Sequence, residues 1–330
     1  MKNIINKMKS LSPVVLLLGF GLMLNLNTYA QESSDSIIVP VKVKPVKNTF
    51  PGVWIIDNQT VMLPIKGTME MDVQHRFGTV TKGYENFWGL FAPSNIRLGF
   101  SYAPTSRLNL GFGITKSNML WDVSAKYALL LQTKGRSPVS VTYYGNAAYD
   151  TRKDPTTNDG STLNYDVERF SFFNQLIIAR KITEKLSVQV APSISHQNAV
   201  SGFYTKNDST GQETFKSMKF DHFAISVAAR YKITEVTSII MNYDQPLTQH
   251  PTNNPNPNLG LGLEFNTSGH SFQVFFSNFA LLNQQRNNLY NNNNPFKYTV
   301  TTTDDKGVVT KSDVKGGQFL IGFNITRLFN

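Results

Sequence analysis

Strict alternation between apolar residues and polar or small residues is the feature of this sequence that most limits its fold. The alternation runs through residues 96–102 and again through 108–114, with a break at 104–106. Successive side chains of a strand point to opposite faces, so a period of two predicts two strands joined as a hairpin. Each strand has one apolar face and one face of small or polar residues. This arrangement suits a wall between lipid and water, as in a transmembrane β-barrel.

The same pattern returns along residues 67–330 and predicts an all-β fold, an antiparallel transmembrane β-barrel of about twelve strands. Every second connection is short, and these short turns fall at 104–107, 134–137, 181–185, 232–235 and 266–270. Barrels of this class have short periplasmic turns and long extracellular loops, so both chain ends are expected in the periplasm. A secreted β-sandwich is the alternative fold, but it predicts no such alternation of connection lengths. Residues 167–180 are apolar on both faces, which leaves their register open.

The first thirty residues have the pattern of an export signal. Lys2, Lys7 and Lys9 precede the apolar run 11–24, and Thr28-Tyr29-Ala30 offers a small-x-small cleavage site. The apolar run is shorter than the roughly 20 residues of a spanning helix, so a cleaved signal peptide over 1–30 is predicted rather than an anchor. The predicted location is the outer membrane, and the absence of cysteine excludes disulfides and a lipoprotein anchor.

Two further segments complete the predicted organisation. Residues 31–66 are punctuated by proline and weakly patterned, with one short strand expected at 53–56. They are predicted to be a periplasmic lead-in or a plug segment, and residues 67–330 are predicted to be the barrel.

The formal net charge is +10 without a clustered basic helix, so nucleic acid is not an expected partner. The expected partners are outer-membrane lipid, lipopolysaccharide and a small solute, and the expected state is a monomer.

Charged residues at positions that face the predicted lumen are the candidate site. They are Glu70, Asp72, Arg76, Arg97, Asp122, Lys126, Arg169, Arg230 and Glu264. An unpaired charge in a confined, poorly solvated lumen is costly, so these groups are expected to pair. They would form either a salt-bridge network that stiffens the barrel or a constriction that selects solutes. Small inward residues between them leave room for water or for the plug segment.

Catalytic motifs are absent from the sequence. It contains no Gly-x-Ser-x-Gly, His-Glu-x-x-His, phosphate-loop or dinucleotide-binding pattern. The five histidines lack metal-ligand spacing, so no metal and no cofactor are predicted. Some membrane-embedded lipid hydrolases place a His and a Ser on barrel strands, which leaves His196 beside Ser195, or His222 with Ser226, as an enzymatic alternative.

Residues 54–140 also resemble a known family. The matching pieces are Trp54-Ile55-Ile56-Asp57-Asn58, His75-Arg76-Phe77-Gly78, Phe87-Trp88-Gly89-Leu90-Phe91, the segment 95–102, the segment 108–114 and the segment 126–132. In order and spacing they resemble an uncharacterised outer-membrane β-barrel family of Bacteroidetes, a domain of unknown function. The chain departs from that family at Phe91, where an acid is usual, and at Thr115-Lys116-Ser117, where an Arg-Ser pair is expected. The resemblance implies a barrel and an outer-membrane address, and it carries no activity.

Three functional hypotheses remain from the sequence. The leading one is a passive channel or binding barrel for small solutes, with no enzymatic activity. The alternative is a structural or interaction barrel with a closed lumen, whose loops at 151–165, 197–217 and 283–315 dock a partner. The third is a lipid-acting outer-membrane enzyme.

Overall fold

The computed structural model describes residues 44–157, 162–206, 212–251, 254–296, 298–303, 309–314 and 318–329. The predicted signal peptide, residues 1–30, lies outside these ranges and stays a prediction.

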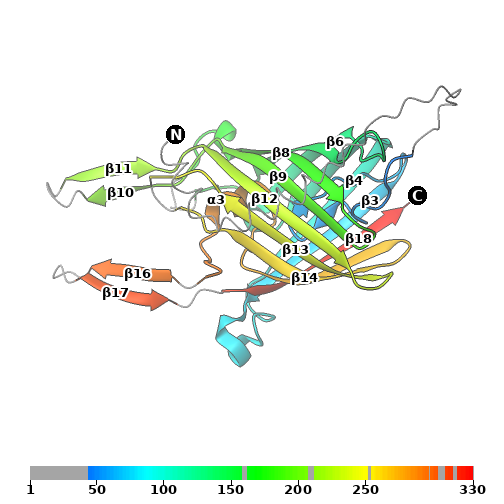
Figure 1. The fold of residues 1–330 in the computed structure, drawn as a ribbon. Coiled ribbons are helices and arrows are strands. Elements are labelled where there is room, and N and C mark those ends of the chain that lie inside the picture. The colour runs from blue at the N-terminus through cyan, green and yellow to red at the C-terminus, as the bar shows by residue number, and fades with distance from the viewer. Residues whose placement is uncertain are drawn as a thin grey trace, which may run out of the picture.

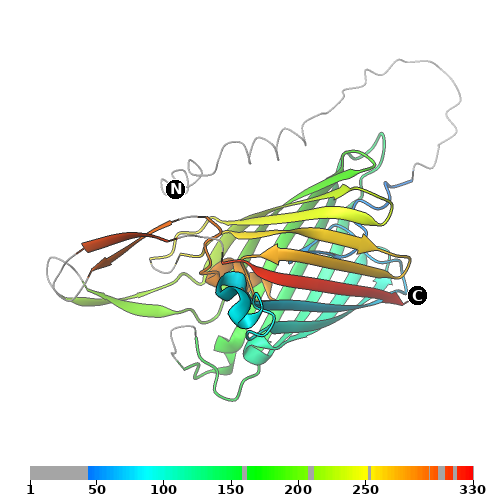
Figure 2. The same cartoon turned by 90° about the horizontal axis from the view of Figure 1, so that it is seen from below.

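Within the described residues, twelve antiparallel strands close into one barrel (Figures 1 and 2). They are β3 (Met69–Thr79), β4 (Asn95–Thr105), β5 (Leu108–Thr115), β6 (Leu120–Leu130), β7 (Ser140–Asp150), β8 (Phe170–Lys181), β9 (Leu186–Gln197), β12 (Asp221–Lys232), β13 (Thr237–Pro246), β14 (Asn258–Asn266), β15 (His270–Ser277) and β18 (Leu320–Phe329). Strands that follow one another in this order pair side by side, and β18 pairs with β3 to close the ring. The predicted twelve-stranded barrel is confirmed.

Burial alternates along these strands as the period of two predicts. On β4, Arg97 and Gly99 face inward and are buried, whereas Phe100 and Tyr102 face outward and are exposed. The register left open for β8 is settled by Phe173 and Ile177, which both point inward and are buried. An apolar residue on the lumen face is stable only where it meets other apolar groups. The lumen beside β8 is therefore packed with protein.

The first hairpin differs slightly from its prediction. β4 continues through Pro104 to Thr105, and the strand pairing shifts register between Tyr102 and Thr105. A bulge of this kind tolerates proline, which has no N–H for the ladder. The turn itself is held by the hydroxyl oxygen of Thr105, which accepts from the backbone N–H groups of Arg107 and Leu108 at 3.2 and 3.0 Å.

Short turns gather at one end of the barrel, and the connections at the other end are longer, apart from the brief one at 116–119. At the long-loop end, two hairpins extend along the barrel axis: β10 (Gly202–Lys206) with β11 (Glu213–Ser217), and β16 (Tyr298–Thr303) with β17 (Val309–Val314) (Figure 1). The same end carries the short helices η1 (Val80–Asn86), η2 (Ser117–Met119), η3 (Asp166–Arg169) and α3 (Gln284–Tyr290). In the described part of the chain, no helix is long and apolar enough to cross a membrane.

The hydrophobic core lies inside the barrel. The chain enters at the short-turn end, where the N–H of Val46 donates to the carbonyl of Gln132 at 2.8 Å, and then forms a small hairpin of β1 (Trp54–Ile55) and β2 (Asn58–Gln59). Apolar residues of this segment pack in one cluster with apolar residues of the wall; the cluster includes Phe50, Ile55, Ile56, Val61, Phe173, Ile177, Ile240 and Phe275. The interior of the barrel is thus a packed hydrophobic core.

Candidate functional site

Two segments that are not part of the wall fill the lumen, and we call residues 50–62 and 282–291 together the lumenal plug. The first segment comes from the short-turn end and the second, which contains α3, from the long-loop end. They meet at Asp57, whose carbonyl accepts from Gln284 Nε2 at 2.8 Å and whose Oδ2 accepts from Asn287 Nδ2 at 2.7 Å. The plug is therefore one body built from two distant parts of the chain.

The hairpin tip is held by amide side chains of the wall. Ile56 has φ 56°, a left-handed conformation that is strained for a β-branched residue. Its N–H donates to Gln273 Oε1 at 3.0 Å, and its carbonyl accepts from Asn324 Nδ2 at 2.6 Å. Gln273 Nε2 also donates to the carbonyl of Trp54 at 2.9 Å. The wall thus satisfies backbone groups that so short a hairpin cannot pair by itself.

The second arm of the hairpin is bound in the same way. Asn58 Nδ2 donates to Asp244 Oδ1 at 2.7 Å, and Gln189 Nε2 donates to the carbonyl of Gln59 at 2.8 Å. The ammonium of Lys126 donates to Gln59 Oε1 at 2.8 Å. Polar contacts of this kind specify the docked position of the hairpin, and the apolar cluster shared with the wall holds it there as well.

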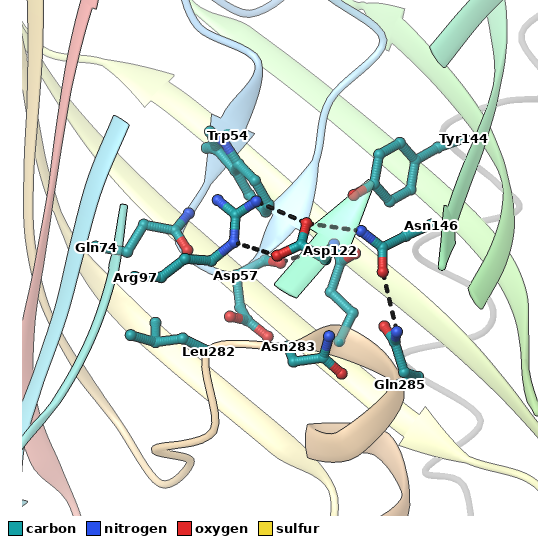
Figure 3. Close-up of a pocket in the computed structure, with 11 residues that line it drawn as sticks. Trp54, Asp57, Gln74, Arg97, Asp122, Tyr144, Asn146, Leu282, Asn283 and Gln285 are labelled. Atoms are coloured by element: carbon teal, nitrogen blue, oxygen red, sulfur yellow. Dashed lines mark hydrogen bonds and ion pairs between the residues drawn. The ribbon is translucent and has the colours of Figure 1, made fainter. Parts of the chain in front are cut away.

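Arg97 is the centre of the charged cluster on the wall (Figure 3). Its Nη1 lies 2.9 Å from Asp72 Oδ2 on β3, and its Nη2 and Nε lie 2.8 and 3.1 Å from the two carboxylate oxygens of Asp122 on β6. The fork on Asp122 is bidentate, the strongest geometry for this pair. The guanidinium also lies over the ring of Trp54, 5.5 Å from its centroid, so the cluster touches the plug.

A chain of hydrogen bonds continues from this cluster to α3 (Figure 3). Asn146 Nδ2 on β7 donates to Asp122 Oδ1 at 3.0 Å, and Gln285 Nε2 donates to Asn146 Oδ1 at 2.9 Å. The ion cluster on β3, β4 and β6 is thereby linked to both halves of the plug.

Most of the predicted lumen charges are brought together here or close by. Arg76 lies 3.7 Å from Asp57 Oδ1 and donates to Asn324 Oδ1 at 2.9 Å, so it also binds the plug. Arg230 Nε lies 2.6 Å from Glu264 Oε2 nearer the short-turn end. Each of these pairs joins two strands or joins the wall to the plug. These contacts show how the predicted charges pair, and whether the paired charges also select solutes stays a prediction.

Glu70 is only 1% exposed, and neither of its carboxylate oxygens has a hydrogen-bond partner among the described residues. It shares a cavity of about 20 Å³ with Lys126, room for one water between the two charges.

Arg169 differs from its prediction: β8 begins one residue later, and Arg169 lies in η3 at the long-loop rim, 3.5 Å from Asp166.

Cavities in the described structure differ greatly in size between the lumen and the short-turn end. A cavity beside Arg97 in the lumen measures about 10 Å³, whereas a vestibule at the short-turn end measures about 500 Å³. The vestibule is lined by turn residues of both charges, including Lys181, Glu184, Lys232 and Glu235. Hydrogen bonds of 2.6 Å from Lys181 and Lys232 lower the pKa of Glu184 and of Glu235, respectively. The plug separates this vestibule from the long-loop end.

The His–Ser pairs that the enzymatic hypothesis rests on do not converge. His196 faces outward and pairs with Asp221 at 2.8 Å, whereas Ser195 is buried on the opposite face. His222 and Ser226 face the same way but stand about 13 Å apart along the strand, at roughly 3.3 Å per residue. His222 Nδ1 instead lies 2.9 Å from His250 Nε2, a contact that the sequence analysis missed because a loop supplies His250. In the part of the chain that is described, no group of three or more His, Asp or Glu could hold a metal ion.

Comparisons with known proteins place the chain among membrane barrels. Solved structures similar to it include the NanC porin (9% identity, TM-score 0.41, covering 79% of this chain and 99% of that one) and the KdgM porin (9% identity, TM-score 0.42, covering 80% and 99%). Another is an outer membrane channel from Pseudomonas putida F1 (11% identity, TM-score 0.45, covering 81% and 97%). None of the curated proteins compared with the chain matches it. The family model described as a membrane bound beta barrel domain (DUF5777) matches residues 50–329, so the chain belongs to this family of membrane-bound β-barrels.

Proposed function

We propose that the protein is a gated channel for small polar solutes, held closed by the lumenal plug. The observation that carries this proposal is that the lumen is filled by two segments outside the wall, each bound to the wall by side-chain hydrogen bonds. In this proposal, the leading hypothesis from the sequence, a passive channel or binding barrel for small solutes, becomes a channel that opens when the plug moves.

The space and the side chains at the short-turn end support this proposal. The vestibule at the short-turn end is large enough for a small solute, and it is lined by charges of both signs and by hydroxyl and amide groups. We place this end in the periplasm, because barrels of this class carry their short turns there. The proposed environment is the outer membrane, with outer-membrane lipid and lipopolysaccharide as the expected partners of the outward surface. The proposed state is a monomer, since the ring of strands closes within one chain.

Removing the plug should convert the protein into an open pore. We expect steady conductance in planar bilayers from a variant that lacks residues 44–66 and carries a glycine-serine linker in place of 282–291. The full chain should show only rare openings under the same conditions. The inward charges, among them Arg76 and Lys126, would then face water and would need no partner from the plug.

The control for this experiment is a variant that carries only the linker at 282–291 and keeps the hairpin. It should conduct less than the doubly altered variant, because β1 and β2 still fill the lumen. Circular dichroism shows whether each variant retains its strands. A doubly altered variant that keeps its strands and passes no current would contradict the channel proposal.

The interaction barrel is the second candidate, favoured by the two hairpins that extend along the axis at the long-loop end (Figure 1). Replacing β10–β11 and β16–β17 by short turns should abolish recovery of a docked partner if this candidate is correct, and should leave the conductance of the plug-free barrel unchanged. We propose no catalytic role, because the described His–Ser pairs face apart or stand apart.

A further inference from the structure

A compact arm between β3 and β4, residues 79–94, leaves the barrel sideways. Figures 1 and 2 show η1, drawn in cyan, standing out from the barrel wall at the long-loop end. The hairpins β10–β11 and β16–β17 leave the same end along the barrel axis. The arm therefore stands out to the side of the barrel at this end and does not continue along its axis.

Large aromatic side chains crowd the exposed surface of this arm. Tyr84 is 81% exposed, Phe91 82%, Trp88 47% and Phe87 43%. Their rings pack on one another, with centroids 5.3 Å apart for Phe87 and Trp88 and 6.0 Å apart for Phe87 and Phe91. A contiguous aromatic surface of this kind is unfavourable in water and marks a contact with lipid or protein.

The arm is a built structure with internal hydrogen bonds. The N–H of Trp88 donates to the carbonyl of Gly83 at 2.6 Å, and the N–H of Gly89 donates to Asn86 Oδ1 at 2.9 Å. Phe87 and Trp88 both adopt the left-handed region, with φ 51° and 53°. Two bulky residues hold this strained conformation only where the surroundings fix it, so the aromatic surface is presented in a defined geometry.

The outward surface of the barrel continues into the arm. His75 and Phe77 on β3 face outward, and the His75 ring stacks on Phe323 of β18 with centroids 5.1 Å apart. The base of the arm closes directly above them, where the N–H of Gly78 donates to the carbonyl of Gly89 at 3.0 Å. Within 79–94, Lys82 and Glu85 are the two charged residues, and their charges cancel.

From these observations we propose that the aromatic arm inserts into the headgroup region of the outer-leaflet lipid beside the barrel. Tyr and Trp rings prefer this region because one side of the ring is apolar and the other forms hydrogen bonds. The sideways direction places the rings over lipid, and the surface they continue is already lipid-facing. The arm would fix the depth and rotation of the barrel at the outer surface. This proposal is independent of whether the lumen conducts.

Tryptophan fluorescence can locate the arm, since the chain has three tryptophans, Trp54, Trp88 and Trp121. The double variant Trp54→Phe/Trp121→Phe reports on Trp88 alone. Its matched control, Trp54→Phe/Trp88→Phe, reports on Trp121, an outward residue at the start of β6. Both are reconstituted in phosphatidylcholine vesicles that contain lipids brominated at known depths. Iodide in the buffer reports exposure to water.

We expect bromine placed near the headgroups to quench Trp88 at least twofold, and iodide to have little effect. Trp121 should be quenched by brominated lipid in the same preparations, which verifies reconstitution. If iodide quenches Trp88 and brominated lipid does not, the arm stands in water, ready for a soluble partner, and the proposal is wrong. If neither quencher reaches Trp88, a second barrel copy covers the arm, and the proposal is equally wrong.

Discussion

Arg97→Ala should lower the free energy of unfolding by about 3–5 kcal/mol, the usual cost of removing one partner from a buried ion pair. The substitution leaves two carboxylates, Asp72 and Asp122, buried without their cation. It also removes the guanidinium from the Trp54 ring, so the plug loses a contact. The loss should exceed that of Arg152→Ala at the rim, where the Arg152 side chain is 28% exposed and solvent screens its pair with Asp150.

Urea unfolding of the protein in detergent micelles, followed by circular dichroism, measures this effect. Arg97→Lys keeps the charge but loses the bidentate fork, and it should fall between the wild type and Arg97→Ala. The triple variant Arg97→Met/Asp72→Asn/Asp122→Asn removes all three charges and should recover much of the loss, because no buried carboxylate is then left unpaired. A value for Arg97→Ala within 1 kcal/mol of the wild type, roughly the effect of an exposed pair, would show that the cluster is solvated.

The partners of Arg97 show what the sequence could and could not predict. Parity along β4 placed Arg97 in the lumen, and the preceding strand β3 offered Asp72. Asp122 lies two strands away on β6, and Arg97 reaches it across β5 because Gly113 stands between them. A Cβ on Gly113 would collide with the guanidinium. Sequence alternation assigns faces, but it gives no information about which small residues open a path between strands.

The lumenal plug is the second feature that the sequence predicted only in part. The apolar residues on both faces of β8 were the one indication that its lumen side meets protein, and their cause became visible only when Phe173 and Ile177 were seen in the core cluster. The asparagine-rich region around α3 was predicted to belong to a long loop, 283–315, because amide side chains usually favour loops. Here Gln285 and Asn287 bind buried oxygens of Asn146 and Asp57. The polar composition of this segment therefore gave no indication that it forms a buried helix.

Whether the hairpin tip must leave the wall for the barrel to open can be tested with an engineered disulfide, since the chain contains no cysteine of its own. A Cβ built on Gly260 of β14 would lie 3.0 Å from Cγ2 of Ile56 and 3.2 Å from its Cδ1. Cγ2 is bonded to the Ile56 Cβ, so in the variant Ile56→Cys/Gly260→Cys the two Cβ atoms lie within about 4.5 Å, the upper end of the range that a disulfide spans. The new Cβ would also lie 2.5 Å from Asn242 Oδ1, so the Asn242 side chain must turn aside. The bond would fasten the hairpin tip to the wall of the barrel.

Oxidation of this variant should reduce the leak of a small polar solute from liposomes to the rate of protein-free vesicles, and a reductant should restore the wild-type rate. The reason is that the hairpin can no longer leave the lumen once its tip is bonded to β14. Ile56→Cys alone, treated with the same oxidant and reductant, is the matched control and should leak at one rate throughout. Loss of free thiol in the double variant verifies the bond. If the leak is the same with the bond formed and with the bond reduced, movement of the hairpin does not open the barrel, and the gate must lie elsewhere.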